Sequence, residues 1–517
     1  MRFVVIAVLS LLAAQVASSA ELRGLATAAQ SILGADQGVY VETAGGTVLL
    51  AQAAAKPVHP ASVSKVPTTL ALLRKLGPEH RFVTTFTAKG RVVDGTLYGD
   101  LIVASDGDPS LVDEDALLVA ERLRQFGISR VSGSLRLEGP LTFDWKTDSD
   151  GASLRRALSG MTPPAALAAV RALLVLDTTS ATAALNTGAT GAAAGAVPIG
   201  TVATTNVPTG NAAGLPTGSA PGLSAGAPLA PLGIRFLAPT SAARTATVVT
   251  AGSAPPAAAP TRPVVTGAAV AAAASVDATA AGADITTVSA AVTAANSVAT
   301  SQAANGGAQP VIQFNGEHPL IVHRSQQLLP LVKSLNDYSN NIFAPFAAAA
   351  GGASAVESLA RSVVPEEMRS EITLGDGAGE NPTNRLSPRA AVKLLRVLEQ
   401  ELAKSGHALC DILPVAGVDD GTLRDRLNGP GEAGHVLGKT GTYGDYGASA
   451  LIGAIRTTDL GTVYFAILNH NVPVPQARHR QDRFVRFLLS QLHSVPWTYQ
   501  RDSRPAITRA EVAIMLP

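Results

Sequence analysis

The most restrictive feature of this sequence is a long stretch of small residues that separates two well-patterned regions. From Thr178 to Ile234 there is no charged and no aromatic residue, and Ala, Gly, Thr and Pro dominate until about Gln309. Such a stretch has little large apolar surface to bury, so it cannot build an ordinary core by itself. We therefore expect a fold built from the two flanking regions. The middle is predicted to be an insertion, either of small-residue β structure or partly disordered.

Length and charge narrow the class of protein. A chain of 517 residues is too long for one ordinary core, which favours two or three domains. Lys and Arg total 40 against 39 for Asp and Glu, a formal net charge of +1. With a net charge near zero, the protein as a whole does not attract a polyanion, so we expect no nucleic-acid partner. Any charged ligand must then be recognised by the groups at its own binding site.

The first twenty residues have the pattern of a secretory signal. Arg2 supplies the positive start, Phe3 to Val16 an apolar run, and Ser18-Ser19-Ala20 a cleavage site. The alternative is a membrane anchor, but the run is shorter than the roughly 20 residues that span a bilayer. We expect residues 1–20 to be removed and the mature chain to be exported to the periplasm or cell envelope. No later segment has the pattern of a span, although peripheral membrane contact stays open.

Cys410 is the only cysteine, so no intrachain disulfide can form. We expect it to be a small buried apolar residue rather than a reactive thiol. The sequence suggests no metal ligands and no cofactor; the loop Asp106-Gly107-Asp108 is expected to be a tight turn.

Hydrophobic periodicity predicts several elements at the two ends of the chain. Segments of alternating pattern are expected to be strands, and segments with apolar residues every three or four positions are expected to be helices. The predicted strands cover 39–42, 47–50, 97–104, 436–440, 449–455 and 463–468. The first predicted helix runs from about Ser62 to Leu76, and the others cover 111–126, 328–350, 388–402 and 482–492.

Three short motifs carry side chains that could catalyse a reaction or bind a substrate. In Ser62-Val63-Ser64-Lys65 a helix places a hydroxyl and an amine on one face, so that an unprotonated Lys65 can accept the Ser62 proton. Alone this pattern occurs by chance about once in a chain of this size, and a capping serine with a solvated lysine would then be the favoured interpretation.

The second and third motifs are polar segments beside predicted apolar elements. Ser339-Asn340-Asn341 offers a hydroxyl that can relay a proton and an amide that can hold a substrate backbone. Lys439-Thr440-Gly441-Thr442 offers a charge for a substrate carboxylate, two hydroxyls, and a glycine that permits close approach to a strand edge. The Thr442 and Ser62 backbone N–H groups could form an oxyanion hole. Alone, these motifs are also typical of a polar turn and an exposed strand end.

Together and in this order, the motifs are the signature of penicillin-binding proteins and class A β-lactamases. The sequence around them resembles that of the class C low-molecular-mass penicillin-binding proteins, the D-alanyl-D-alanine carboxypeptidase/endopeptidase family. The resemblance covers about two thirds of the chain, and the combined motifs are specific. It is carried by residues 59–84, 97–111, 323–344, 413–427 and 434–442.

The resemblance implies a fold and a set of roles. The fold is an α/β (α+β) penicillin-recognising, β-lactamase-like domain, with a five-stranded antiparallel sheet between helical layers and a large inserted region. Ser62 is implied as the acylated nucleophile and Lys65 as general base, with Ser339 and Asn341 as proton relay and positioning groups. Lys439, Thr440 and Gly441 are implied as the substrate-carboxylate edge, and Thr442 completes the oxyanion hole. The implied division is a signal peptide at 1–20, transpeptidase-like parts at 21–85 and 313–517, and inserted domains at 86–312.

The implied partners are peptidoglycan stem peptides and β-lactams. The implied reaction is D-Ala-D-Ala carboxypeptidase or D-alanyl endopeptidase hydrolysis through an acyl-enzyme on Ser62. A serine β-lactamase and a non-catalytic peptidoglycan-binding homologue remain as alternatives.

Two departures from the family pattern affect details. Pro67 lies where an aliphatic residue is usual, and is expected to kink the first helix. The segment 376–381 replaces a serine- and arginine-containing family segment, which leaves Arg385 as a candidate for stem-peptide contact. His59 and His435 are expected to be electrostatic or steric neighbours, and 478–480 the solvated face of a helix.

Overall fold

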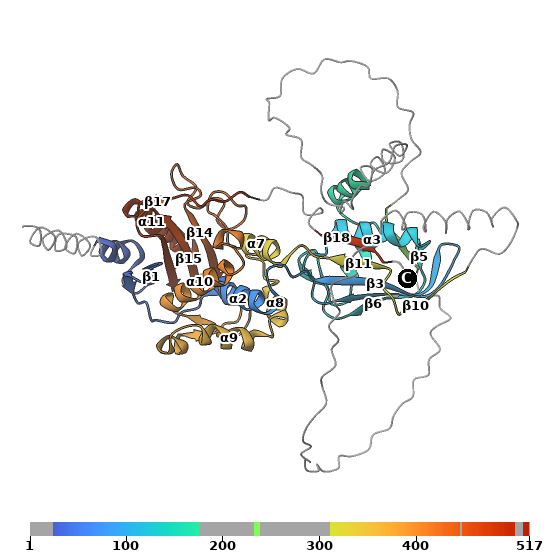
Figure 1. Ribbon diagram of the computed structural model, residues 1–517, viewed down its shortest axis with the longest axis horizontal. Coiled ribbons are helices and arrows are strands. Elements are labelled where there is room, and N and C mark those ends of the chain that lie inside the picture. Colours follow the sequence, from blue (N-terminus) through green and yellow to red (C-terminus); the bar gives the residue numbers. More distant parts are fainter. Residues whose placement is uncertain (1–23, 175–231, 238–310, 445–446, 502–509, 516–517) are drawn as a thin grey trace, which may run out of the picture.

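The computed structural model describes residues 24–174, 232–237, 311–444, 447–501 and 510–515, which form two lobes (Figure 1). Each lobe is built on one larger sheet. Segments from both sides of the small-residue stretch contribute to each lobe. The predicted signal peptide lies outside the described residues. Within the described ranges, no helix combines the length and apolar character needed to cross a bilayer.

The sheet of the first lobe is antiparallel. Its order is β14-β15-β16-β1-β2, and the short β17 pairs with β15. The predicted five-stranded antiparallel sheet is therefore present, with one short strand added. The bounds are β1 Gly38–Thr43, β2 Val48–Gln52, β14 Val436–Tyr443, β15 Ala448–Thr457, β16 Thr462–His470 and β17 Ser494–Val495.

This sheet lies between two apolar cores because successive side chains of a strand point to opposite faces. Tyr40 and Ile452 pack into one core, with residues of α2 (Lys65–Leu76) and α10 (Pro388–Ala403). Neighbouring residues Val39 and Leu451 pack into the other core, with α11 (Val474–Gln491). The predicted placement of an antiparallel sheet between helical layers is thus observed. Cys410 is buried in the first core, and its burial raises the pKa of the thiol.

The first helix begins directly after a 3-10 turn, η1 (Ala61–Ser64). α2 continues without interruption from Lys65 to Leu76 and ends at Gly77, whose φ is 83°. The helix is not interrupted at Pro67. Pro67 lies in its first turn, where backbone N–H groups have no intrahelical acceptor and proline removes no required donor.

The second lobe contains a mixed sheet of order β18-β11-β3-β4-β5-β9, with β10 beside β3 and β6 beside β4. Helices α3 (Asp113–Gln125) and α4 (Ala152–Leu158) pack their apolar residues on this sheet. The bounds are β3 Val83–Val93, β4 Thr96–Ser105, β5 Arg130–Val131, β6 Leu135–Glu138, β9 Arg235–Phe236, β10 Ile312–Asn315, β11 Ile321–Arg324 and β18 Glu511–Ile514.

The observed division between the lobes differs from the predicted ranges. β10, β11 and β18, which the sequence placed in the second transpeptidase-like part, belong to the sheet of the second lobe. β10 and β11 pair with β3, and β18 pairs with β11. The chain therefore returns to the first lobe only after Arg324. Of the small-residue stretch, only 232–237 is described, and it supplies β9. The rest of this stretch, for which the sequence predicts either small-residue β structure or partial disorder, lies outside the described residues.

The segment Asp106-Gly107-Asp108 follows β4 with a bend at Asp106, and it supplies the buried carboxyl of Asp108. The His323 Nδ1 atom lies 2.6 Å from an Asp108 oxygen, and its Nε2 atom lies 3.4 Å from an Asp115 oxygen. All three side chains are buried. Burial lowers the pKa of His323, but the two carboxylates outweigh it and raise the pKa to about 10. The imidazole is therefore charged between two carboxylates.

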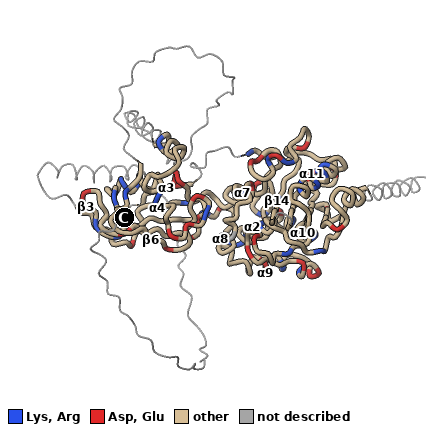
Figure 2. Tube along the Cα trace, turned by 180° about the vertical axis from the view of Figure 1, so that it is seen from behind, with Lys and Arg blue, Asp and Glu red and all other residues tan. Residues whose placement is uncertain are grey.

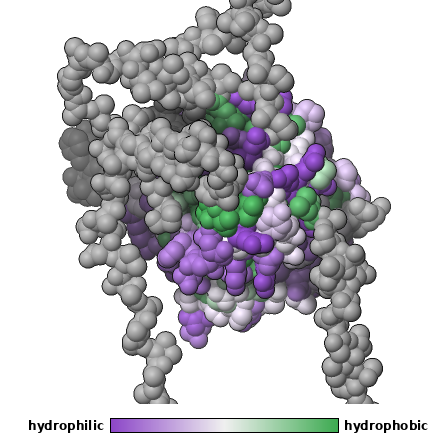
Figure 3. Space-filling model, turned by 90° about the vertical axis from the view of Figure 1, so that its right-hand side faces the viewer, coloured by the Kyte–Doolittle hydropathy of each residue, from purple (hydrophilic) through white to green (hydrophobic). Residues whose placement is uncertain are grey.

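The remaining elements are short strands, 3-10 turns and helices. They comprise β7 Thr142–Phe143, β8 Lys146–Thr147, α7 Leu328–Tyr338, α8 Phe343–Ala349, α9 Ala353–Ser362, η3 Glu366–Glu371, β12 Ile372–Thr373, β13 Arg385–Leu386 and η4 Leu409–Asp411. Charges of both signs are interspersed on the two lobes (Figure 2). The uncovered end of the second lobe is mostly hydrophilic, with separate apolar groups (Figure 3).

Candidate active site

Ser62 and Lys65 meet at the junction of η1 and α2. One turn of helix brings residues three apart to the same side, and the Lys65 Nζ atom lies 2.9 Å from the Ser62 Oγ atom. Ser62 is half-buried, whereas Lys65 has 0% of its surface exposed. The first motif thus pairs an accessible hydroxyl with a buried amine.

The second motif reaches Lys65 through the turn that ends α7. Ser339 caps this helix with a φ of 55°, a left-handed conformation that is uncommon outside glycine. The turn directs the Ser339 carbonyl and the Asn341 side chain back to Lys65. The Lys65 Nζ atom lies 2.8 Å from the Ser339 carbonyl oxygen and 2.9 Å from Asn341 Oδ1.

The third motif lies on β14, the outermost strand of its sheet. The Lys439 Nζ atom donates to the Ser339 Oγ atom at 2.7 Å and to the Thr440 carbonyl at 2.9 Å. Lys439 has 0% exposure and Thr440 is buried. Five predicted side chains are therefore joined by hydrogen bonds: Ser62, Lys65, Ser339, Asn341 and Lys439.

Gly441 and Thr442 have surroundings that the sequence did not indicate. A Cβ atom on Gly441 would lie 2.6 Å from the Pro60 carbonyl oxygen. The glycine thus lets β14 approach the serine-bearing turn, whereas the sequence suggested close approach of a substrate. Thr442 is exposed at the end of the motif, and its Oγ1 atom accepts a hydrogen bond of 2.8 Å from Arg478. Arg478 is exposed, as predicted for this helix face, but its contact with the motif was missed.

The two buried amines have depressed pKa values. Burial lowers the pKa of Lys65 to about 8, although the charges of Glu380 and Asp376 act in the opposite direction. Burial and then the charge of Lys65 lower the pKa of Lys439 well below its ordinary value, with Asp337 opposing. Desolvation penalises the ammonium form because a buried charge loses its hydration.

A loop between β12 and β13 packs against the serine-bearing turn. The Asp376 carboxylate accepts hydrogen bonds from the backbone N–H groups of Gly379, Glu380 and Asn381 at 2.7 to 2.9 Å. Burial raises the pKa of Asp376, but these bonds and one from the Asn384 side chain lower it below its ordinary value. A Cβ atom on Gly379 would lie 2.0 Å from the Ala61 carbonyl oxygen, so only glycine fits this contact.

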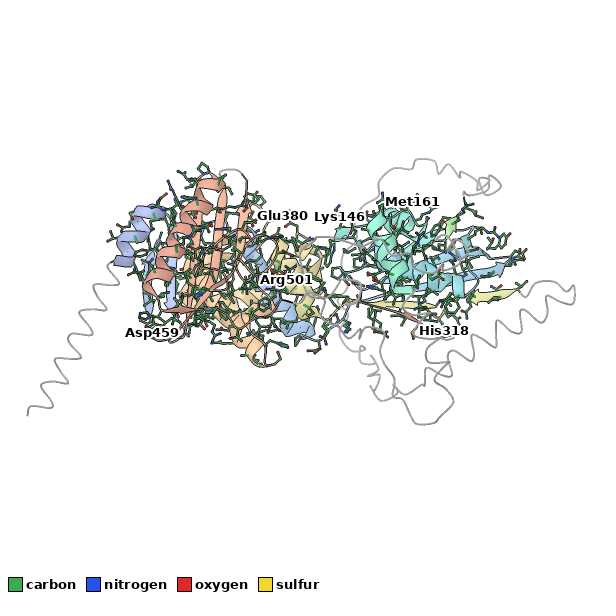
Figure 4. The ribbon with its side chains drawn as sticks, turned by 90° about the horizontal axis from the view of Figure 1, so that it is seen from above. Lys146, Met161, His318, Glu380, Asp459 and Arg501 are labelled. Atoms are coloured by element: carbon green, nitrogen blue, oxygen red, sulfur yellow. The ribbon has the colours of Figure 1, made fainter. Side chains whose placement is uncertain are left out.

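This loop also brings in Glu380, which no sequence motif indicated. Its Oε1 atom accepts a hydrogen bond of 2.6 Å from Asn341 Nδ2. The candidate Arg385 instead donates to the carbonyls of Pro382 and Asn384 within the loop. Glu380 lies on the first lobe and Lys146 on the second, on either side of the junction between the lobes (Figure 4).

His59 forms part of the same surroundings, whereas His435 does not contact the motifs. The His59 ring stacks on Tyr443 with centroids 3.9 Å apart. His59 Nδ1 accepts from the Ala61 N–H group, which leaves Nε2 to donate to the Asn381 carbonyl. Burial lowers the pKa of His59, so the neutral ring is favoured. His435 instead contacts Ser494 Oγ at 3.0 Å.

An antiparallel sheet between helical layers and three converging motifs around a half-buried serine define a penicillin-recognising serine-enzyme fold. The model of the D-Ala-D-Ala carboxypeptidase 3 (S13) family matches residues 19–215 and 240–491, and the chain belongs to this family. A D-alanyl-D-alanine carboxypeptidase, DacB of Haemophilus influenzae, is 33% identical over 78 residues. That alignment spans 15% of this chain and 16% of the relative.

Solved structures from Bdellovibrio bacteriovorus share the fold along most of the chain. The predatory endopeptidase Bd0816, solved in complex with the immunity protein Bd3460, matches with a TM-score of 0.54 and 18% identity. That match covers 92% of this chain and 99% of the other. Penicillin G-acylated Bd3459, also in complex with Bd3460, matches with a TM-score of 0.55 and 17% identity over the same shares.

Proposed function

We propose that the chain is a serine-type peptidase that hydrolyses D-alanyl peptide bonds of peptidoglycan through an acyl-enzyme on Ser62. The single observation that carries this proposal is the set of contacts around Lys65. Its Nζ atom lies within 2.9 Å of three atoms, namely the Ser339 carbonyl oxygen, Asn341 Oδ1 and Ser62 Oγ.

An ammonium Lys65 can donate to all three of these oxygens. A neutral amine has two N–H donors and one lone pair, and the same three contacts also accommodate this form. The carbonyl and amide oxygens can only accept, so they take the two donors. The lone pair is then left for the Ser62 hydroxyl, which donates its proton as its oxygen attacks a carbonyl carbon. Burial makes this form accessible by lowering the pKa of Lys65 to about 8.

The proposed reaction has two steps, acylation of Ser62 and hydrolysis of the acyl-enzyme. The Ser62 oxygen forms a bond to the carbonyl carbon of the penultimate D-Ala, and its proton passes to Lys65. The C–N bond to the terminal residue breaks, and the leaving nitrogen takes the proton from Lys65 through the Ser339 hydroxyl. The Ser339 Oγ atom lies 3.4 Å from Lys65 Nζ and 2.7 Å from Lys439 Nζ. Water then hydrolyses the ester and restores the Ser62 hydroxyl.

The substrate would lie along the outer strand β14. Such an edge offers unpaired backbone groups to an extended peptide. The Ser62 and Thr442 N–H groups are assigned to the oxyanion. Lys439 is fully buried, whereas Arg478 is exposed and donates to Thr442 Oγ1, so we assign the positive charge for a substrate carboxylate to Arg478.

Location and ligands belong to the same proposal. The pattern of residues 1–20 supports export to the periplasm, where peptidoglycan stem peptides are available. Acylation of a structural neighbour by penicillin G supports β-lactams as covalent probes of this chain. Cleavage of terminal D-Ala and of D-alanyl cross-links would use the same groups.

The test is intact-protein and peptide mass spectrometry after incubation with benzylpenicillin. We expect one adduct on the peptide that contains Ser62, and none in Ser62→Ala. Ser64→Ala is the matched control, because this buried serine lies on the same peptide and should leave the adduct intact. Absence of any adduct in the folded wild-type chain would overturn the proposal and favour the non-catalytic alternative.

Turnover separates the peptidase from the β-lactamase alternative. A peptidase is expected to retain the penicilloyl adduct and to release D-Ala from peptides ending in D-Ala-D-Ala. Rapid, multiple turnover of nitrocefin without release of D-Ala would identify a β-lactamase instead.

A further inference from the structure

Glu380 is an acidic residue beside the proposed nucleophile that belongs to none of the three motifs. It is exposed, and its Oε1 atom lies 2.6 Å from Asn341 Nδ2. The other end of the same amide, Asn341 Oδ1, lies 2.9 Å from Lys65 Nζ. A continuous set of contacts therefore runs from Glu380 through Asn341 and Lys65 to Ser62.

The backbone of Glu380 is held firmly relative to Ser62. Its N–H group donates to the Asp376 carboxylate at 2.7 Å. The preceding residue, Gly379, contacts the Ala61 carbonyl so closely that a Cβ atom would lie 2.0 Å from it. The carboxylate is thus placed by the loop itself and not only by a long flexible side chain.

We propose that Glu380 is a positioning residue for the acylation of Ser62: it fixes the orientation of the Asn341 amide and adds a negative charge next to Lys65. This proposal rests on the proposed function and concerns the same site. Glu380 acts through Asn341 and Lys65, and nothing in the argument requires it to touch the substrate.

The orientation matters because an amide side chain has two ends of similar size but opposite hydrogen-bonding character. A flipped Asn341 would direct its NH2 group at the Lys65 amine, which would leave two donors facing each other. A carboxylate can only accept, so Glu380 selects the arrangement in which the amide oxygen faces Lys65. That is the arrangement in which the lone pair of a neutral Lys65 is left for Ser62.

The charge of Glu380 acts on the protonation of the base. The charged groups around Lys65 are Glu380 and Asp376 on the loop, which favour the ammonium form. On β14 lies the buried amine of Lys439, whose own pKa is lowered by burial and by the charge of Lys65. The neutral amide of Asn341 and the hydroxyls of Ser62 and Ser339 complete the set of polar side chains. Removal of the Glu380 charge should thus lower the pH at which Lys65 becomes active.

Two substitutions separate the two effects. Glu380→Gln keeps an oxygen that can accept from Asn341 but removes the charge. Glu380→Leu removes both the acceptor and the charge. Glu366→Gln is the matched control, because it removes one exposed negative charge on η3, and Glu366 is not among the charged groups that act on Lys65.

The measurement is the rate constant of acylation by a fluorescent penicillin as a function of pH, with near-UV circular dichroism to confirm folding. For Glu380→Gln we expect the rising limb to move to lower pH by about 0.2 to 0.7 units, the effect of one exposed charge pair. The displacement should shrink at about 1 M salt, where such charges are screened. Glu380→Leu should show the same displacement and also a lower maximum, by about 2- to 10-fold for one lost hydrogen bond.

The outcomes decide this proposal separately from the proposed function. Unchanged profiles for both Glu380 variants, with a normal adduct on Ser62, would overturn the role of Glu380 and leave the peptidase proposal standing. An equal displacement in Glu366→Gln would also overturn it, because the effect would then be that of general surface charge. Absence of an adduct in the wild-type chain would instead overturn the proposed function itself.

Discussion

The two lobes each bury basic groups, but they surround them differently. In the first lobe, the amines of Lys65 and Lys439 are fully buried among hydroxyl, carbonyl and amide oxygens. In the second lobe, the His323 imidazole lies between the carboxylates of Asp108 and Asp115. The pKa of Lys65 is lowered to about 8, whereas the pKa of His323 is raised to about 10.

The difference shows how surroundings decide what a buried cation can do. Neutral oxygens satisfy the N–H groups of an amine without stabilising its full charge, so the proton is released near neutral pH. Two carboxylates make proton release from an imidazole costly, and the charged group then serves as a fixed link between segments. We therefore expect the first cluster to govern activity and the second to govern stability.

Substitution of the first buried amine should have the largest effect. Lys65→Met keeps the length of an apolar side chain but removes the proposed base, so acylation should slow by about 10²- to 10⁴-fold. The measurement is the acylation rate with a fluorescent penicillin. Lys75→Met, at the exposed end of the same helix, should leave the rate within about twofold. Similar rates for both variants would contradict the assignment of Lys65 as base.

The corresponding change in the second lobe should affect stability instead. His323→Gln leaves Asp108 and Asp115 buried without a cation, and should lower the free energy of unfolding by about 3–5 kcal/mol. Urea denaturation followed by circular dichroism measures this change. His318→Gln, an exposed histidine of the same lobe, should have little effect. If His323→Gln slowed acylation in the folded protein while stability stayed unchanged, the contrast between the lobes would be wrong.

The two clusters should respond to pH in opposite directions. Acylation should rise about tenfold per pH unit and level off above about pH 8, because only the neutral Lys65 accepts a proton. His323 has a folded-state pKa of about 10, above its ordinary value of 6.5. Its contribution to stability is then complete below about pH 6.5 and is lost as pH rises through 10.

Parallel pH series of acylation rate and denaturation midpoint check this prediction. In His323→Gln the fall in stability between these pH values should be reduced, while the acylation profile keeps its midpoint. A wild-type acylation rate that does not depend on pH from 6 to 9 would contradict the proposed base.

The smallest expected effect is that of Arg478→Ala. This substitution removes the hydrogen bond to Thr442 Oγ1 and one exposed charge at the end of β14. We expect acylation efficiency to fall by about 2- to 10-fold, mostly through weaker binding of β-lactams with a carboxylate. Arg483→Ala, on an exposed position of the same helix, is the control. An equal loss in both variants would point to general surface charge.

The convergence of the motifs could be predicted from sequence because each motif lies on an element whose period is visible. Apolar residues at helical spacing predicted Ser62 and Lys65 on one side of a helix, and the two residues meet across the junction of η1 and α2. Alternation placed Lys439 on a strand. The antiparallel meander followed from three neighbouring alternating segments. These features depend on local patterns.

Other features depend on contacts between distant segments and left no local signal. Glu380 and Arg478 reach the site only because a loop and a helix far along the chain pack beside it. The left-handed turn at Ser339 occurs at a residue type that does not favour it. The pairing of β18 with β11 joins strands from opposite sides of most of the first lobe's sequence, which explains why the predicted division of the chain differed.

The return of the chain to the second lobe at β18 has a consequence for synthesis. The sheet of the first lobe needs β14 to β16 beside β1, and the sheet of the second needs residues 511–514 beside β11. Neither domain can therefore complete its pairing while the ribosome is still producing residues before these strands. Such distant pairings slow maturation, and until they form the nascent polypeptide has unpaired strand edges that are prone to aggregation.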